Sequence, residues 1–226
     1  TIAQTGQVFD VWHRPGNVHD SNGARAFILA CVREIKAIMP RCVIEARMDS
    51  AFFSDDIVRM LDAEGVEFTI SVPFERFVAL KALIENRRRW CCLNGQWSFF
   101  ETNWKPASWD ERYRFVFIRS QNRKQYKGAV QLDLFIPYEY GYDFKVIVTN
   151  KQTSAKKALA FHNGRGAQEG VFAELKSQTQ MDYVPTRTKA GNQTFLLSAV
   201  LAHNLNREMQ MLCYEKERNT TEKRAP

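Results

Sequence analysis

The chain has 226 residues, of which 45% are hydrophobic, and its 32 Lys and Arg against 25 Asp and Glu give a formal charge of +7. This length and apolar content allow a sizeable core and exclude wholesale disorder, and no apolar run approaches the roughly 18 residues of a membrane span. Five irregularly spaced cysteines argue against a disulfide framework and fit a cytoplasmic protein.

Strands and helices alternate in the first part of the chain. Residues 1 to 14 are predicted to form two short strands around Thr5-Gly6. Apolar residues that recur every three or four positions then predict a helix over about 21 to 39, capped by Ser21 or Asn22.

Two further strand and helix pairs follow. Residues 42 to 49 alternate between apolar and polar side chains, as expected of a strand that ends at Asp49. The sequence then predicts a helix over 55 to 63 capped by Ser54, a strand over 66 to 72 and a helix over 74 to 89.

A basic, aromatic block comes next. Residues 85 to 127 hold ten Lys and Arg, four acids and four of the five Trp. The predicted strands of this region cover 97–102, 112–120, 131–137 and 144–150. Basic residues interleaved with aromatic ones suit a polyanion with flat bases, so we favour nucleic-acid binding over a β-rich module with a solvated basic face.

The last part of the chain is predicted to be helical, over about 154 to 176 and 193 to 213, with His203 in the core. The sequence as a whole predicts an α/β core with a β-rich insertion. The predicted divisions are a first core part (1–84), the insertion (85–150), C-terminal core helices (151–214) and a polar tail (215–226).

Three charged residues are spaced for one helix face. Arg165, Glu169 and Lys176 fall within about 40° of arc if the helix is continuous. One carboxylate between two cations suits a site for a hard divalent metal and a phosphodiester, although such a stripe is also typical of a solvated helix face. Asp49 favours the first interpretation, because α/β proteins place sites at the carboxyl ends of sheet strands.

These residues stand in a recognisable pattern. The stretch His162-x2-Arg165-x3-Glu169-x6-Lys176 matches the spacing of the motif Y-x2-R-x3-E-x6-K, with His in place of Tyr, and ARMDSAFF supplies Asp49. Two further stretches resemble the same family, HRPGNVHDSNGA (13–24) and LAHNLNRE (201–208). On these motifs the chain resembles the DDE transposases of bacterial insertion sequences over nearly its whole length.

The resemblance implies an RNase H-like mixed sheet flanked by helices. It also implies Mg²⁺-dependent DNA cleavage and strand transfer at the ends of the element, in the bacterial cytoplasm with the nucleoid. Asp49 and Glu169 would ligate two Mg²⁺ ions, which Mn²⁺ can replace, while His162, Arg165 and Lys176 would contact DNA. The partners would be the transposon ends, the target DNA and a second copy in a homodimer.

The same resemblance raises two further expectations. An aromatic residue of the insertion, Trp97 or Trp104, would stack on a flipped base. Such enzymes also need a third carboxylate on a first strand, and before the first predicted helix the chain offers only Asp10 and Asp20. We therefore expect that strand and its Asp upstream of Thr1, and this chain to be inactive alone.

Two alternatives remain open at this point. The chain is either a transposase catalytic region or a decayed or repurposed fragment that binds DNA without cutting it. A different RNase H-like nuclease is a third, weaker interpretation.

Overall fold

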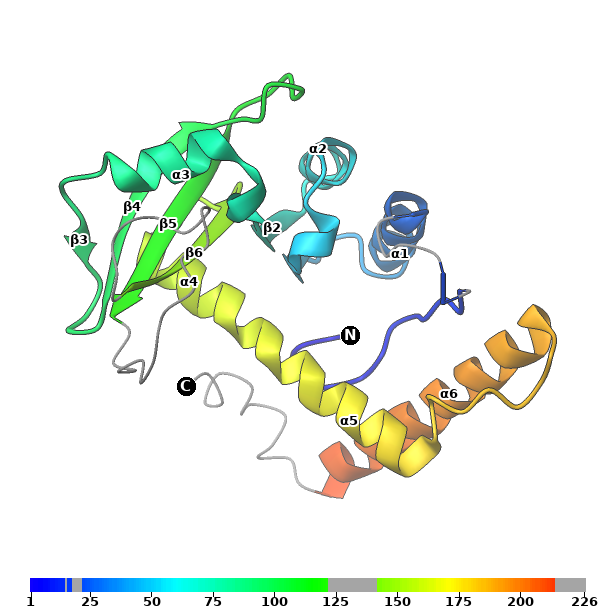
Figure 1. Cartoon of the computed structure of the whole chain (residues 1–226). Helices are drawn as coiled ribbons and strands as arrows, with labels where there is room; N and C mark the ends of the chain where they lie inside the picture. The colour runs from blue at the N-terminus through cyan, green and yellow to red at the C-terminus, as the bar shows by residue number, and fades with distance from the viewer. Residues whose placement is uncertain (15, 18–21, 122–141, 214–226) are drawn as a thin grey trace, which may run out of the picture. The chain divides into compact units, whose positions relative to one another are not determined.

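A computed structural model describes residues 1–14, 16–17, 22–121 and 142–213 (Figure 1). The chain divides into two compact units: the helical unit, formed by 1–42 and 163–226, and the sheet unit, formed by 43–162. The strand predicted over 131–137, the Ser21 cap and the tail over 215–226 lie outside the described residues. No helix within the described ranges has the length and apolarity needed to span a bilayer.

The sheet unit contains one mixed sheet of six strands in the order β1-β2-β6-β5-β4-β3. In chain order the strands are β1 (Glu45–Met48), β2 (Glu67–Ser71), β3 (Cys91–Cys92), β4 (Trp97–Trp104), β5 (Tyr113–Gln121) and β6 (Tyr142–Thr149). β1 and β2 run parallel, and every other neighbouring pair is antiparallel. The structure therefore confirms the mixed α/β fold, which is consistent with an RNase H-like architecture.

The strands predicted as an insertion extend the core sheet. β6 pairs antiparallel with β2, with Ile70 opposite Val148, and β5 and β4 follow in the same sheet. The basic, aromatic strands are therefore hydrogen-bonded to the strand pair that begins the fold. By compactness the chain divides at residues 42 and 162, whereas the sequence predicted divisions at 84 and 150.

Helices cover both faces of this sheet (Figure 1). α3 (Val78–Glu85) lies over the face that carries Phe115 and Phe117, while α4 (Ala155–Asn163) packs on the opposite face against Val116 and Ile118. Successive strand residues point to opposite faces, so a strand buried on both sides reads as a continuous apolar run. This explains why Phe115 to Ile118 are all buried.

α2 (Asp55–Ala63) connects β1 to β2, and its start agrees with the sequence. The Ser54 hydroxyl accepts a hydrogen bond from the Ile57 amide at 3.4 Å, and Asp55 and Asp56 occupy the first turn. A side-chain acceptor at the cap and carboxylates in the first turn both stabilise a helix N-terminus. The predicted cap is confirmed. The helix predicted over 74–89 is shorter, a 3₁₀ turn over Phe74–Arg76 followed by α3.

The helical unit contains α1 (Ala24–Ile38), α5 (Ala167–Thr179) and α6 (Lys189–Cys213). The prediction that Asn22 caps α1 is wrong, because the cap position is Gly23 and no side chain bonds there. Gly23 has φ 75°, and a Cβ at this position would lie 2.8 Å from the Trp12 ring. Only glycine fits both the left-handed backbone and the close approach of that ring.

The two strands predicted over residues 1–14 do not form. This segment lies along α6, whose side chains bind its backbone in place of a neighbouring strand. Asn204 accepts from the Val8 amide at 2.9 Å and donates to the Val8 carbonyl at 2.8 Å. Gln193 does the same for the His13 amide and the Val11 carbonyl, at 2.7 and 2.9 Å.

His203 is buried, as the sequence predicts. Its Nε2 lies 3.0 Å from the carbonyl of Gly6, while its Nδ1 has no hydrogen-bond partner among the described residues. The ring thus adds a third link between α6 and the N-terminal segment.

The continuous helix predicted over 154–176 is also interrupted. α4 ends at Asn163, a 3₁₀ turn covers Gly164–Gly166, and α5 begins at Ala167. Two glycines within three residues weaken a regular helix by about 1 kcal/mol each, which accounts for the interruption.

Candidate functional site

Asp49 follows β1 directly, at the carboxyl end of the parallel strand pair. Its backbone is extended and its side chain is exposed, and a carboxylate oxygen accepts the Ser50 amide at 2.5 Å to begin a 3₁₀ turn. One step beyond the Met48–Ile70 pair, the register places Asp49 level with Ser71. The predicted metal ligand thus stands where an open α/β sheet presents side chains to a ligand.

Polar contacts join the end of α4 to one face of β1 and β2. Arg47 donates to the Phe161 carbonyl at 3.1 Å, and its guanidinium lies 4.9 Å from the centre of the Phe161 ring. Burial lowers the pKa of Arg47, against the charge of Glu45, which raises it. The sequence analysis did not single out Arg47 as a residue of the site. The available signal was a cation on the predicted strand, two residues before the candidate ligand Asp49.

His162 takes part in this fastening. It is fully buried, with Nε2 2.9 Å from the Ser71 hydroxyl and Nδ1 3.0 Å from the Thr69 hydroxyl. Both ring nitrogens are therefore bonded within the sheet unit, so the expected DNA contact of His162 finds no support in this geometry. The two hydroxyls, at alternate positions of β2, were also missed by the sequence analysis.

The remaining motif residues belong to the helical unit. Glu169 lies in the first turn of α5 and is exposed, as is Lys176 two turns later. These two share a helix face, since seven residues return to within about 20° of the same direction. Arg165 lies in the 3₁₀ turn before α5 and is half-buried, so the predicted face of three residues is not continuous.

The donor chemistry of Asp49 and Glu169 fits a hard divalent cation. Both are exposed carboxylates, and Mg²⁺ prefers oxygen ligands and keeps several of its waters. Across the described ranges, no group of three or more His, Cys, Asp or Glu side chains is gathered for a metal ion. A carboxylate in the first turn of a helix also has a structural role, because it complements the helix dipole.

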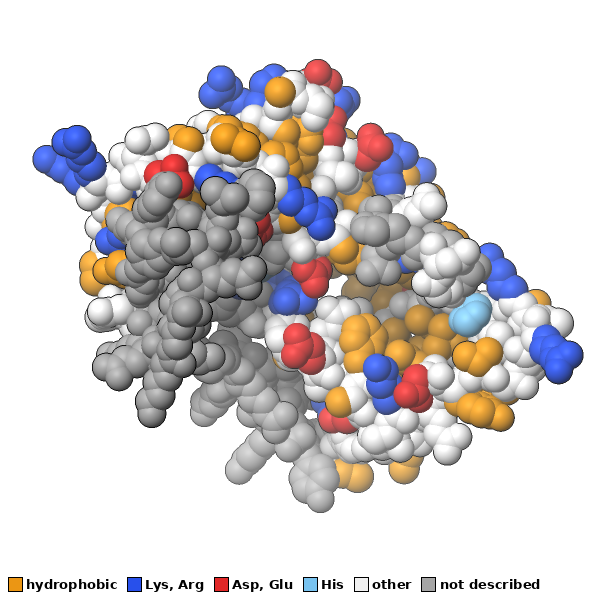
Figure 2. Space-filling view, in the orientation of Figure 1, with side chains coloured by type: hydrophobic (Ala, Val, Ile, Leu, Met, Phe, Trp, Pro, Cys, Tyr) orange, Lys and Arg blue, Asp and Glu red, His pale blue; other side chains and the backbone are white. Residues whose placement is uncertain are grey.

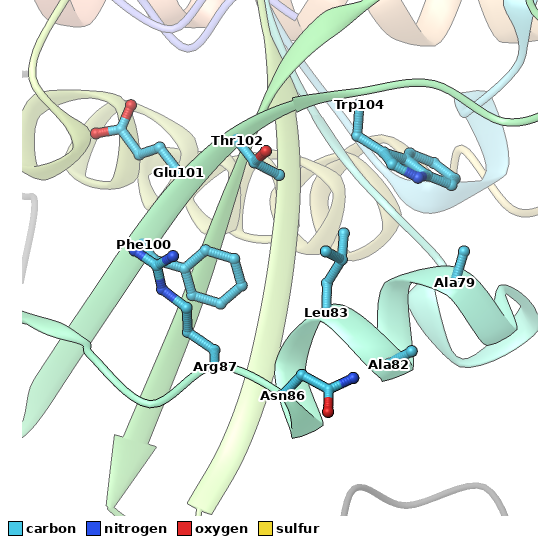
Figure 3. A pocket seen from close by; sticks show the side chains of 9 residues that line it. All are labelled: Ala79, Ala82, Leu83, Asn86, Arg87, Phe100, Glu101, Thr102 and Trp104. Atoms are coloured by element: carbon cyan, nitrogen blue, oxygen red, sulfur yellow. The ribbon is translucent and has the colours of Figure 1, made fainter.

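A groove of about 490 Å³ lies between α3 and β4 in the sheet unit (Figure 3). Phe100, Trp104 and Leu83 line it, together with Asn86 and Arg87, the two residues that follow α3. The Arg87 guanidinium lies 4.8 Å from the centre of the Phe100 ring. An aromatic floor with a cation and an amide at the rim suits a flat, polar ring.

The structure distinguishes the environments of Trp97 and Trp104, the two candidates for stacking on a flipped base. Trp104 lines this groove and contacts Phe77 and Phe115 edge-on. Trp97 packs instead against the cluster beneath α4 that includes Val116 and Ile118. Trp104 therefore lines this groove and Trp97 does not.

Five of the arginines that the structure describes in the block fall into two classes. Arg114 bonds to Glu101 and to the carbonyls of Lys151 and Thr153, so it serves the fold. Arg119 is likewise held, between the rings of Trp90 and Tyr142 at 4.5 and 4.4 Å.

Arg87, Arg88 and Arg89 form the second class, an exposed run beside the groove. Figure 2 shows Lys and Arg side chains around hydrophobic ones in the region of α3. A polyanion would meet this exposed run rather than the two arginines that serve the fold.

The chain matches the model of a known protein family. The model of the family described as "Transposase DDE domain group 1" matches residues 3–224. No curated protein matches the chain.

Proposed function

The chain belongs to the transposase DDE domain family, group 1, and from this premise we propose that it acts as a catalytic region that cuts and joins DNA phosphodiester bonds. The observation that supports the proposal best is the position of Asp49, exposed at the carboxyl end of β1 beside the packed end of α4. The family implies DNA as the partner, and we propose the ends of an insertion sequence and a target as that DNA.

We assign the chemistry to five residues of the motifs. Asp49 and Glu169 would hold divalent metal, proposed as Mg²⁺, which supplies activation of the attacking oxygen and stabilisation of the leaving one. Arg165 and Lys176 would orient the phosphodiester through its oxygens. His162, bonded to Thr69 and Ser71, would act as a positioning residue that fixes the end of α4 on β2.

A matched pair of variants on α5 tests this assignment. Glu169→Gln removes the proposed ligand, whereas Glu174→Gln changes another exposed glutamate on the same helix. In a protein that also supplies the third carboxylate that such enzymes need, and with duplex DNA from the regions that flank the coding sequence, we expect Glu169→Gln to lower Mg²⁺-dependent nicking by about 100-fold or more, since metal stabilisation contributes several kcal/mol. Equal nicking by the two variants would contradict the assignment.

A second candidate function is DNA binding without cleavage. It is favoured by one observation, that within the described ranges no three ligating side chains come together. In that case the unmodified chain binds DNA with strong salt dependence and produces no nicks with Mg²⁺ or Mn²⁺.

We propose the exposed run Arg87–Arg89 as a phosphate-binding surface of the sheet unit. Each phosphate contact contributes about 0.9 to the slope of log affinity against log salt. Replacing all three arginines by Ala should therefore reduce this slope by about 1 to 3, while Arg41→Ala, at an exposed arginine outside the run, should leave it nearly unchanged.

Trp104 is our candidate for stacking on an unpaired base, because it lines the groove. Stacking on an aromatic ring contributes about 1 to 3 kcal/mol per base. Trp104→Leu should therefore weaken binding of a duplex with one unpaired base about 5-fold or more relative to the fully paired duplex. A loss that is equal for both duplexes would assign Trp104 to packing alone.

A further inference from the structure

The turn between β3 and β4, at one edge of the sheet, contains the exposed pair Asn94-Gly95. The side-chain oxygen Oδ1 of Asn94 accepts hydrogen bonds from two backbone amides, that of Gln96 at 3.0 Å and that of Trp97 at 2.9 Å. An asparagine that bonds to the backbone in this way closes a turn in place of a main-chain carbonyl. Because both donors follow Gly95 in the chain, the side-chain carbonyl lies along the Gly95 peptide.

This arrangement favours a reaction between the two residues of the pair. The backbone nitrogen of a glycine can attack the Cγ carbon of a preceding asparagine, because no Cβ hinders its approach. Negative charge then develops on Oδ1, and donors that already point at such an atom lower the barrier. Within the described ranges no acceptor is bonded to the Gly95 amide, so its proton is accessible to solvent. The turn thus offers both an accessible nucleophile and stabilisation of the charge that its attack creates.

We propose that Asn94 is a site of spontaneous deamidation, at which the folded chain changes its own covalent structure. Gly95 gives its amide proton to solvent, and its nitrogen forms a bond to Cγ of Asn94. The bond from Cγ to the side-chain nitrogen breaks, that nitrogen takes up a proton and leaves as ammonia, and a cyclic succinimide remains. Water then opens the ring at either carbonyl, which gives aspartate or isoaspartate. No electrons are transferred in any of these steps.

Two other Asn-Gly pairs provide a comparison within the chain. Asn163 ends α4 with a helical backbone, φ −65° and ψ −26°. Side chains in a helix point toward its N-terminus, so Cγ of Asn163 points away from the nitrogen of Gly164. Asn22 accepts the Arg14 guanidinium through its main-chain carbonyl, and among the described residues no backbone amide donates to its side chain. The fastest reaction is therefore expected at Asn94.

The two products would alter the edge of the sheet differently. Aspartate keeps an acceptor for the two amides and adds one negative charge a few residues after the run Arg87–Arg89. Isoaspartate also inserts a methylene group into the backbone of the turn. β3 consists of Cys91 and Cys92 alone and pairs with only two residues of β4, so a lengthened turn should release it. The basic block would therefore lose positive charge and order as the molecule ages.

Peptide mass spectrometry of the full chain, aged at neutral pH without nucleic acid or metal, tests this proposal independently of the proposed catalytic function. Trypsin places the three Asn-Gly pairs in separate peptides, so one sample reports the conversion of each. Asn94 should convert at least about tenfold faster than Asn22 and Asn163, since donors to a developing charge change rates by that factor or more. In urea, where the turn is lost, the three rates should converge.

Gly95→Ala is a variant that should keep the fold. A Cβ at this position would meet no atom within 4 Å, and the backbone is not left-handed there. The added methyl group crowds the attacking nitrogen, so conversion of Asn94 should fall at least about fivefold while hydrogen exchange in β3 stays unchanged. Gly170→Ala, at another glycine with open space around it, is the control and should leave the rate as it is.

The proposal is overturned by either of two results. One is that the three Asn-Gly pairs convert at equal rates in the folded chain. The other is that the Gly95→Ala chain converts at Asn94 as fast as the unmodified chain.

Discussion

The sheet unit and the helical unit bury their apolar side chains to different extents. In the sheet unit, β5 is covered on both faces, and Phe115, Val116 and Phe117 have no exposed surface. In the helical unit, one cluster contains only Val8, Leu175 and Val200 as buried members, and α6 keeps several large apolar side chains exposed. A sheet with helices on both sides satisfies its own packing, whereas a few amphipathic helices leave apolar area exposed.

The two units also satisfy their backbones differently. β strands of the sheet unit pair with one another in register. In the helical unit the extended N-terminal segment depends on the amides of Gln193 and Asn204. Each strand residue of a sheet gains ladder bonds cooperatively with its neighbours. The hydrogen bonds from Gln193 and Asn204 to the N-terminal segment, which we call the clasp, depend instead on single side chains. We therefore expect the sheet unit to tolerate surface changes and the helical unit to be sensitive at particular polar positions.

The largest expected effect comes from the sheet core. Phe117 is fully buried and stacks on Phe100 at 4.4 Å, so Phe117→Ala should lower the free energy of unfolding by about 3 to 5 kcal/mol. Phe172→Ala, at a residue that is 36% exposed on α5, should cost less than about 1 kcal/mol. Hydrogen exchange followed by mass spectrometry measures both. If Phe117→Ala deprotects α6 as strongly as β5, the two units unfold together and the contrast between them fails.

A buried cation in the sheet unit gives the next effect. Lys151 bonds to Glu45 and Glu67, and its side chain is 5% exposed. Lys151→Met should lower the free energy of unfolding by about 2 kcal/mol, a value reduced because both carboxylates are partly exposed. Urea unfolding measures this difference.

The pH dependence of that difference has a definite sign. Burial acts to lower the pKa of Lys151, but the hydrogen bonds and charges of the two glutamates outweigh it and raise the pKa above 10.5. A group whose pKa is raised by folding stabilises below its unfolded value and loses that contribution as the pH passes its folded value. The gap between Lys151→Met and the unmodified chain should therefore persist up to about pH 10.5 and shrink above it.

The clasp of the helical unit should respond more weakly and more locally. Asn204→Ala removes both bonds to Val8 and should cost about 1 to 2 kcal/mol, with faster hydrogen exchange at the Val8 amide. Asn206→Ala, at an exposed asparagine on the same helix, provides the control and should change neither quantity appreciably. An unchanged Val8 exchange rate in Asn204→Ala would show that the segment is held by packing rather than by the clasp.

The smallest expected loss of stability comes from the N-terminal cap of α2. Ser54→Ala removes the cap of α2 and should cost about 0.5 to 1 kcal/mol in urea unfolding, the low end because the bond is 3.4 Å long. Ser54→Asp keeps an acceptor and should cost only a few tenths of a kcal/mol. A larger loss with Asp than with Ala would contradict capping as the role of this residue.

Ser54 also illustrates which parts of the fold the sequence predicts well. A cap, two acids and an apolar periodicity lie within ten residues, so α2 can be predicted from its own short stretch of sequence. The strands of the basic block are readable for the same reason, because their apolar runs are continuous. What the local pattern does not contain is the pairing of β6 with β2, which joins residues about 80 positions apart.

The candidate site was predictable only in part. Asp49 is a candidate because a strand pattern ends on it, and the structure does end β1 one residue before it, but its role as a ligand stays a prediction. The environment of His162 was not predictable, since its partners Thr69 and Ser71 come from a strand about 90 residues earlier. The interruption at Gly164–Gly166 had a local signal in its two glycines, which the spacing of Arg165 and Glu169 outweighed in the sequence reasoning.

The mixed pairing of β2 also has a consequence in time. Its parallel neighbour β1 precedes it in the chain, but its antiparallel neighbour β6 is made about 80 residues later. At the usual 5 to 20 residues per second of synthesis, one edge of this apolar strand waits roughly 4 to 16 s for its partner. During that interval Phe68 and Ile70 belong to an open edge that can pair with another nascent chain. Slower translation between β2 and β6 should therefore lower the yield of folded protein.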